Sequence, residues 1–358
     1  MCLCPVTVNR MICGRKVQQI VPCGKCPECI KDKQNEYMIR TVEESYKVTG
    51  IWFITLTYNE QSVPNFDIDG EVDESTGEVE RLNVKSLNNK DISIWKKRVK
   101  MRLERMKKSK LDMRYIICGE YGPRTNRPHY HGLLMNISDR EAYEFKKDWE
   151  VHYGFTCFKK VPMLDVTKVG KYVVKYITKV REFENPLVLT GKVQKPRKIT
   201  SVGFGRPIQE RFERMRREIL CESFMKLDNI DDISHVPVLK LNALVKKIAK
   251  KRYYHLDGRD YKLPNYYKRL LFYVKDENKG ALRATELSKM VSRAIQDDLV
   301  QDFNAKLAEL AARNGVSKDS EEFDKLAKSL CDSEQIAREE RCKTVLQNNW
   351  SALRKSRF

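Results

Sequence analysis

The chain has 358 residues, 41% of them hydrophobic, and its 69 Lys and Arg against 49 Asp and Glu give a net charge of +20. This length favours two or three domains with real cores, and the excess positive charge favours a polyanionic partner, nucleic acid above all. No apolar run approaches the eighteen or so residues of a membrane span, and the N-terminus lacks the continuous apolar stretch of a secretory signal, so we expect a non-secreted protein in a reducing cytoplasm.

Cysteines gather near the N-terminus, where six of the eleven precede residue 30. A reducing compartment argues against disulfides, whereas the two-residue spacing of Cys23, Cys26 and Cys29 suits thiolate ligands of one tetrahedral ion. Cys4 or Cys13 could supply the fourth ligand, and we favour Cys4. Buried thiols are one alternative, and a redox pair is another, although no thioredoxin-like βαβ pattern surrounds the cysteines. The cluster predicts a structural zinc knuckle.

The next elements are a helix, a strand and an acidic insert. Residues 30–48 have helical periodicity, and residues 51–58 form a short β-branched run typical of a strand inside a sheet. Residues 60–80 contain eight acidic residues and no Lys or Arg. This composition, with Pro and Gly breakers, predicts a surface loop or a disordered insert. A sharper interpretation is an acidic flap that competes with DNA for the basic helix that follows.

A basic amphipathic helix is expected over residues 91–108. Residues 90–110 hold ten Lys or Arg, a stripe suited to contacting phosphates, although a merely solvated face is an equal alternative. We expect Lys96, Lys97 and Lys100, together with Arg127 further on, to bind DNA. The predicted apolar face of the helix consists of Ile92, Trp95, Val99, Leu103 and Met106.

A β-hairpin that could carry a metal site is predicted over residues 113–135. His129 and His131 are two apart on the returning strand, so their side chains share a face. If the strands pair across the turn, Glu120 lies opposite the histidines and completes a set of three ligands. A carboxylate makes the set harder, which favours Mg²⁺ or Mn²⁺ over a closed zinc site. The alternative is two ordinary, half-buried strand histidines.

Three further elements follow the hairpin. Ser138 and Glu141 have the spacing of a capping box at the start of a helix that runs to about residue 150. A strand is expected over residues 155–161, and another helix from residue 166 or 167. The order strand, helix, hairpin, helix, strand, helix predicts an α+β fold with an antiparallel sheet.

Two tyrosines on the last of these helices are candidate nucleophiles. Tyr172 and Tyr176 are four residues apart and share a helix face, so both could reach one metal-bound phosphate. A phenol with a pKa of about 10 needs help to attack phosphorus. Lys175 and Lys179, each three residues after a tyrosine, would favour the phenolate and steady the phosphate. The alternative is an amphipathic helix whose tyrosines only pack.

The C-terminal part, residues 186–358, reads as a basic linker followed by a mostly helical region. Charged and apolar residues alternate at helical spacing over residues 265–354, which suggests a bundle or an assembly arm. No Gly-x-x-x-x-Gly-Lys-Ser/Thr motif occurs in the sequence, so a helicase motor would have to come from the host.

Three of these motifs together resemble those of one family. The strand at residues 53–58, the His129-Tyr130-His131 run with Glu120 upstream, and the segment 172–179 occur in the order found in HUH-superfamily rolling-circle replication initiators. The cysteine run at residues 23–29 narrows the resemblance to the initiators of gokushovirus-like microviruses, which are small phages with circular single-stranded DNA. The resemblance covers roughly residues 1–185.

The resemblance implies an RRM-like, or ferredoxin-like, nickase domain over residues 50–185. Such an enzyme is a site-specific single-strand DNA endonuclease and strand-transferase. One tyrosine attacks the viral origin and stays joined to the 5′ phosphate, and the second cleaves the regenerated origin. The implied partners are the viral origin DNA and the helicase and DNA polymerase of a bacterial host. Residues 1–49 would form the zinc-knuckle segment with its helix.

Two other functions stay open at this point. One is a plasmid relaxase or transposase with the same chemistry, against which the cysteine cluster speaks. The other is a non-catalytic, zinc-stabilised DNA-binding protein, which the net charge and the cysteines would explain equally well.

Overall fold

A computed structural model describes most of the chain, which divides into two compact units, one of residues 37–208 and one of residues 1–36 with 209–358. The sequence pattern put the domain boundaries at residues 49 and 185 instead. The described residues are 6–12, 15–24, 26–72, 76, 79–108, 110–122, 125–162, 166–168, 170, 173, 193–220, 233–234, 236–251, 253–275, 282–317, 320–330, 333, 336–337 and 340.

A five-stranded sheet in the order β8-β3-β7-β6-β9 forms the centre of the first unit. All its strand pairs are antiparallel, so the predicted α+β class with an antiparallel sheet is confirmed. The short strand β9 falls in the segment that was interpreted as a linker. The strands are β3 (Ile51–Tyr58), β6 (Arg114–Tyr121), β7 (Pro128–Met135), β8 (Gly154–Lys160) and β9 (Lys198–Thr200).

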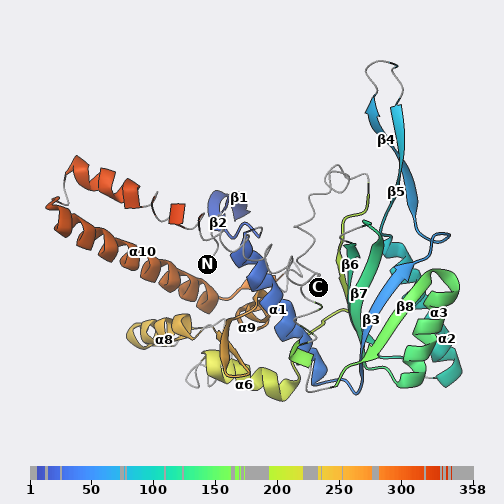
Figure 1. The fold of residues 1–358 in the computed structure, drawn as a ribbon. Coiled ribbons are helices and arrows are strands. Elements are labelled where there is room, and N and C mark those ends of the chain that lie inside the picture. Colours follow the sequence, from blue (N-terminus) through green and yellow to red (C-terminus); the bar gives the residue numbers. More distant parts are fainter. Residues whose placement is uncertain are drawn as a thin grey trace. The chain divides into compact units, whose positions relative to one another are not determined.

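Helices α2 (Asn89–Lys107) and α3 (Asp139–His152) pack together on one face of this sheet (Figure 1). Their contact is aromatic, because the Trp95 ring meets the rings of Phe145 and Trp149 edge-on at 5.4 and 5.6 Å. The predicted capping box of α3 is present. The predicted apolar face of α2 is buried except at Met106, which is 55% exposed because it lies in the last turn, beyond the packed part of the helix.

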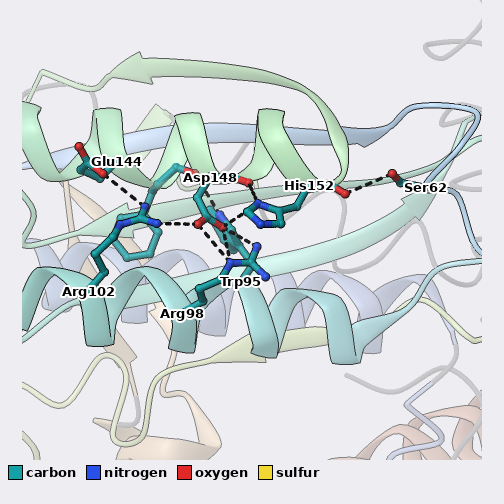
Figure 2. A network of polar contacts seen from close by, with 8 residues as sticks. Ser62, Trp95, Arg98, Arg102, Glu144, Asp148 and His152 are labelled. Atoms are coloured by element: carbon teal, nitrogen blue, oxygen red, sulfur yellow. Dashed lines mark hydrogen bonds and ion pairs between the residues drawn. The ribbon is translucent and has the colours of Figure 1, made fainter.

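A buried carboxylate joins the two helices (Figure 2). The Asp148 side chain has no exposed surface, and it accepts hydrogen bonds from Arg98 Nε at 2.9 and 3.1 Å and from Arg102 Nη1 at 3.0 Å. Arg102 also pairs with Glu144 at 3.3 Å. Two of the arginines on the basic helix therefore serve packing, and their charge is already neutralised within the fold.

The end of α1 (Pro27–Ser45) covers part of the opposite face of the sheet. Glu44 is 1% exposed and lies 2.5 Å from Arg114 Nε on β6, and it also accepts a hydrogen bond from the Gly205 amide. Lys198 on β9 stacks its ammonium over the Tyr37 ring at 4.3 Å. Because both sheet contacts involve β6 and β9, they place this end of α1 over that side of the sheet.

The acidic insert is a β-hairpin and not a loop, so the prediction for residues 60–80 was wrong. Strands β4 (Asn65–Val72) and β5 (Val79–Lys85) pair antiparallel and extend away from the sheet (Figure 1). Phe66 lies opposite Val84, and Ile68 lies opposite Leu82. Apolar residues alternate with the acidic ones in β4, and this period of two favours a strand despite the charge.

Among its described residues, the second unit contains helices and three two-stranded hairpins. None of these hairpins was predicted, and β12–β13 lies in the region after residue 265 that was expected to be a helical bundle or an assembly arm. None of the helices that the structure describes is both long enough and apolar enough to cross a membrane. The elements are β1 (Val6–Ile12), β2 (Arg15–Val21), α6 (Gln209–Leu220), α8 (Val238–Lys250), β10 (Tyr253–Leu256), β11 (Arg259–Lys262), α9 (Asn265–Phe272), β12 (Tyr273–Lys275), β13 (Leu282–Ala284) and α10 (Glu286–Asn314).

The buried carboxylate yields a stability prediction. Asp148→Ala should lower the free energy of unfolding by about 2 kcal/mol, because it removes charge-assisted hydrogen bonds while both arginines keep partial access to water. Urea unfolding followed by tryptophan fluorescence measures the change. The matched control is Glu150→Ala on the same helix, whose carboxylate is 41% exposed and 3.9 Å from Lys146. Equal stability of the two variants would show that the network does not hold the helices together.

Candidate metal centre

The register of β6 and β7 decides which side chains meet. Glu120 lies directly opposite His129, and Cys118 lies directly opposite His131. Residues opposite one another in an antiparallel pair project to the same face. Glu120, His129 and His131 therefore share the face that α2 and α3 leave open, as the hairpin interpretation predicted.

The three side chains converge on one point. Glu120 Oε2 lies 3.4 Å from His129 Nε2 and 3.5 Å from His131 Nε2, and the three potential ligand atoms all lie within 4.8 Å of one another. The Glu120 side chain is 7% exposed, against 16% and 12% for the two imidazoles. This spacing fits three donors of a single divalent ion that solvent or a substrate can reach from one side.

The outer nitrogen of each imidazole is held by a hydrogen bond. His129 Nδ1 lies 3.0 Å from the Arg127 carbonyl, and His131 Nδ1 lies 3.0 Å from Thr55 Oγ1. A carbonyl only accepts, so in the neutral imidazole of His129 the proton lies on Nδ1, which leaves the lone pair of Nε2 for a metal ion. Such outer contacts orient metal-binding imidazoles and raise their basicity. They make both rings better ligands.

Arg127 was predicted to bind DNA, but its side chain is engaged within the fold. The guanidinium donates to the Tyr58 carbonyl through Nη2 at 2.6 Å and Nε at 3.2 Å, and Nη1 lies 2.6 Å from Glu60 Oε1. Glu60 also pairs with Lys85, and together these cations lower the pKa of its carboxyl. The anchored arginine fixes the residue whose carbonyl orients His129.

The donor set suits a hard cation. Two imidazoles and one carboxylate leave open coordination positions, unlike a closed tetrahedral thiolate site. Magnesium and manganese commonly take such carboxylate-containing sites together with oxygens of a phosphate substrate. The residues present fit a divalent ion such as Mg²⁺ or Mn²⁺, and which metal binds stays a prediction.

The predicted tyrosine helix is described only in part. Residues 166–168, 170 and 173 are helical, and a Cβ atom added at Gly170 would lie 3.4 Å from Thr41 Cγ2 on α1. This segment therefore approaches α1, whose end covers part of the histidine-bearing face. Tyr172, Lys175, Tyr176 and Lys179 lie outside the described residues, so their roles stay predictions.

The lysines of α2 that were predicted to bind DNA differ in their surroundings. Lys96 is buried, with its ammonium 3.6 Å from the centre of the Tyr115 ring, and burial lowers its pKa to about 8. Lys97 is exposed, and Lys100 lies 3.7 Å from Glu104 while remaining 43% exposed. Lys97 and Lys100 are accessible to a phosphate, whereas Lys96 is used inside the fold.

Three cysteines of the second unit form a separate cluster. The Sγ atoms of Cys23, Cys26 and Cys29 lie within 4.8 Å of one another, with Cys26 and Cys29 buried. The Cys26 amide donates to Cys23 Sγ at 3.2 Å, and Gly24 between them has φ +67°, which favours glycine. This tight turn aims the thiols at one point and fits three ligands of a zinc ion. Cys4 lies outside the described residues.

Thr55 supports the imidazole of His131 but was not among the residues predicted from the sequence. Thr55 lies opposite His131 in the pairing of β3 with β7, and it touches the imidazole only because the strands meet in this register. The alternation of polar Thr55 and Thr57 with apolar residues on an otherwise buried strand was the available signal. It indicated a polar site on one face of β3.

Comparisons with known proteins agree with the location of this site. Residues 51–181 match the model of a family of replication-associated proteins that is described under the name ORF2. The chain is 30% identical over 170 residues to the replication-associated protein VP4 of Bdellovibrio phage phiMH2K, covering 43% of this chain and 48% of the relative. It is 26% identical over 122 residues to the replication-associated protein ORF2 of Spiroplasma virus 4, covering 34% and 33%.

The chain thus spans about half the length of one of these relatives and a third of the other. No solved structure matches it. The matched family segment contains β3, β6, β7 and β8 together with all three candidate ligands. The candidate metal centre therefore lies in the part of the chain that matches the family of replication-associated proteins.

The support of His131 by Thr55 is testable without an activity assay. Thr55→Val keeps the shape of the side chain but removes the hydroxyl, and we expect Mn²⁺ to bind roughly 10- to 100-fold more weakly, as for other outer contacts of metal ligands. His131→Ala should lose more affinity. Calorimetric titration with Mn²⁺ measures both. The control is Thr57→Val, one residue pair along the same face. Equal effects of the two Thr variants would show that the Thr55 hydroxyl does not support the metal ligand.

The cysteine cluster yields a second metal prediction. Freshly purified, reduced protein should contain one tightly held Zn²⁺ per chain, and chelation should unfold the N-terminal segment, because thiolate ligation couples metal binding to folding. Elemental analysis counts the zinc, and circular dichroism follows the unfolding. Cys26→Ser should lose the zinc, whereas Cys157→Ser, at an exposed cysteine on β8, should keep it. Zinc-free protein with an intact N-terminal fold would contradict the assignment.

Proposed function

We propose that the protein is a replication initiator of a small phage, namely a metal-dependent endonuclease and strand-transferase that nicks a single-stranded DNA origin and starts rolling-circle replication. The observation that carries the proposal is the convergence of Glu120, His129 and His131 on one open face of the sheet. Its support is that this segment matches a family of replication-associated proteins, and that the chain is similar to such proteins of two phages. The HUH-type assignment and the gokushovirus-like source are part of the proposal.

The metal centre would receive the scissile phosphate. A bound Mg²⁺ or Mn²⁺ would polarise the phosphate and share the negative charge that develops during the reaction. The two imidazoles offer Nε2 to the ion, since Nδ1 of each is engaged by Arg127 or Thr55. Glu120 contributes a carboxylate that the surrounding sheet keeps largely from water, which favours its interaction with a cation.

The nucleophiles would be Tyr172 and Tyr176. The phenolate oxygen of one tyrosine attacks the phosphorus, the bond from phosphorus to the 3′ oxygen breaks, and that oxygen takes a proton and leaves as a 3′ hydroxyl. The product is a tyrosine joined to the 5′ phosphate. Lys175 and Lys179 would favour the phenolate and balance the phosphate charge. One phosphodiester replaces another, so the reverse reaction reseals a strand.

The rest of the chain would hold the DNA. Lys97 and Lys100 on α2 are exposed, but α2 covers the face of the sheet opposite the metal centre, so they would bind phosphates of a DNA segment away from the cleavage site. Such phosphate contacts add affinity and make it salt-dependent. We propose that a host polymerase extends the 3′ hydroxyl and that a host helicase opens the duplex, within the cytoplasm of a bacterial host. The zinc knuckle would be structural, because a site filled by thiolates has no position for a substrate.

Two alternative functions would use the same features. A plasmid relaxase or transposase would form the same covalent adduct, and only the DNA sequence that it cleaves would distinguish it. A non-catalytic, zinc-stabilised DNA-binding protein would bind DNA without forming an adduct. The convergent carboxylate and imidazoles favour an enzyme, because phosphate binding alone requires only basic side chains.

The two-tyrosine mechanism predicts a specific pattern of variants. With single-stranded viral DNA and Mn²⁺, Tyr172→Phe and Tyr176→Phe should each retain some single-round adduct, because either phenolate can stand in line with one phosphate. The double variant should form none, and neither single variant should release unit-length circles. Denaturing gels resolve the adducts and the circles.

Two results would contradict these assignments. Absence of any adduct with the wild-type protein across all fragments of the genome would exclude the enzyme. Normal release of circles by one of the single variants would mean that the substituted tyrosine is not a nucleophile and only packs. Gel shifts in parallel should show that both variants still bind DNA.

A further inference from the structure

The edge strand β8 exposes an aromatic side chain on the histidine-bearing face. Phe155 is 64% exposed, and Cys157 and Lys159, which follow at the spacing of one strand face, are exposed as well. Phe158, on the opposite face of the same strand, packs against the core under α2 and α3. The histidine-bearing face of β8 is therefore exposed at these three residues, whereas its other face packs under the helices.

Strand register connects Phe155 to the metal centre. Thr57 on β3 lies opposite Phe155 on one side and opposite His129 on the other, and His129 lies opposite Glu120. These four residues form one row across four strands, and all project to the same face. Two strand spacings of roughly 4.8 Å place Phe155 about 10 Å from His129 along this row.

The chemistry of this row changes from one end to the other. At its inner end, Glu120 and His129 are ionisable and largely buried. Thr57 in the middle carries a small hydroxyl, and the phenyl ring of Phe155 at the outer end is exposed. Lys159 lies on the same face, opposite Phe53, whose ring stacks on His131 at 6.0 Å. Phe155 and Lys159 are four residues apart on this strand face, about 13 Å at the usual rise of a strand. Proteins bind single-stranded nucleic acids by combining such aromatic rings with basic residues.

We infer that Phe155 is a stacking platform for a base of single-stranded DNA whose neighbouring phosphate lies at the metal centre. This inference rests on the proposed function and adds to it a positioning residue for the substrate. The base would lie flat on the phenyl ring while Lys159 neutralises a phosphate of the same strand. Because every base has a π face, the platform would set the position of the strand and leave base identity unread.

A partner protein fits this surface less well. A protein interface would need a contiguous apolar patch, whereas the neighbours of Phe155 on this face are Thr57 and Cys157, with Lys159 further along the strand. The row also leads straight to the candidate metal ligands. A single-stranded DNA whose phosphate is bound at the metal centre could continue across β3 or along β7. The path across β3 leads to Phe155.

The test compares exposed aromatic residues on the two sides of the domain. Phe155→Ala should lower the affinity for a fluorescent oligothymidylate, measured by anisotropy in Mn²⁺, by roughly 5- to 100-fold, the loss expected for one stacked base. The slope of log affinity against log salt should stay unchanged, because no phosphate contact is lost. Phe155→Trp should preserve the affinity. The matched control is Tyr143→Ala, at a tyrosine 58% exposed on α3, which should bind like wild type.

Two further measurements separate stacking from charge. Lys159→Ala should lower the affinity and reduce the salt slope by about one phosphate contact. An oligonucleotide containing 5-iododeoxyuridine should crosslink on irradiation to the peptide that contains residue 155. Thermal unfolding of each variant should match wild type, since the substituted side chains are exposed.

The outcomes distinguish this inference from the proposed function. If wild-type protein forms the covalent adduct while Phe155→Ala binds as tightly as Tyr143→Ala, the platform is wrong and the enzyme stands. If no adduct forms but Phe155→Ala alone loses affinity, the stacking surface stands without the enzyme. A change in sedimentation of Phe155→Ala with unchanged DNA binding would mean that the ring contacts protein, which overturns the inference.

Discussion

The candidate site depends on the pairing register of β6 with β7. A slip of one residue would move every side chain of one strand to the other face, separating Glu120 from His129. The opposite face of the same strands holds this register, because Tyr130 and Leu134 are fully buried there, and the Tyr130 hydroxyl accepts a hydrogen bond from the Asn88 amide at 2.8 Å. The packing under α2 thus keeps the metal ligands aligned on the other side of the sheet.

The same division of faces explains where a substrate can approach. Helices α2 and α3 fill one face, and the end of α1 is fixed over β6 and β9 by the buried Glu44 and its partner Arg114. The remaining part of the second face has half-buried residues on β3 and exposed residues on β8. Charge is divided as well, since Arg98 and Arg102 on α2 pair with Asp148 and Glu144. The ten Lys and Arg of residues 90–110 therefore overstate the positive charge that α2 offers to DNA.

Local patterns in the sequence were enough to predict much of the first unit. Alternation predicted the hairpin and the shared face of His129 and His131, and the Ser138 capping box predicted the start of α3. The support by Thr55 and the burial of Lys96 depend on packing between segments far apart in the chain, which periodicity does not reveal. The hairpin of β10 and β11 had a local signal in the sequence that was overlooked, namely the pair Asp257-Gly258, which is typical of two-residue hairpin turns. Both residues have positive φ in this turn.

The acidic insert is connected to the candidate metal centre. Charge suggested a loop, but the base of the β4–β5 hairpin is tied to the metal centre through a series of contacts. Lys85 at the end of β5 pairs with Glu60 at 2.6 Å, and Glu60 pairs with Arg127 at the same distance. The Arg127 carbonyl in turn holds His129 Nδ1. Because each contact fixes the next, the insert helps to position a ligand that its own acidic residues do not touch.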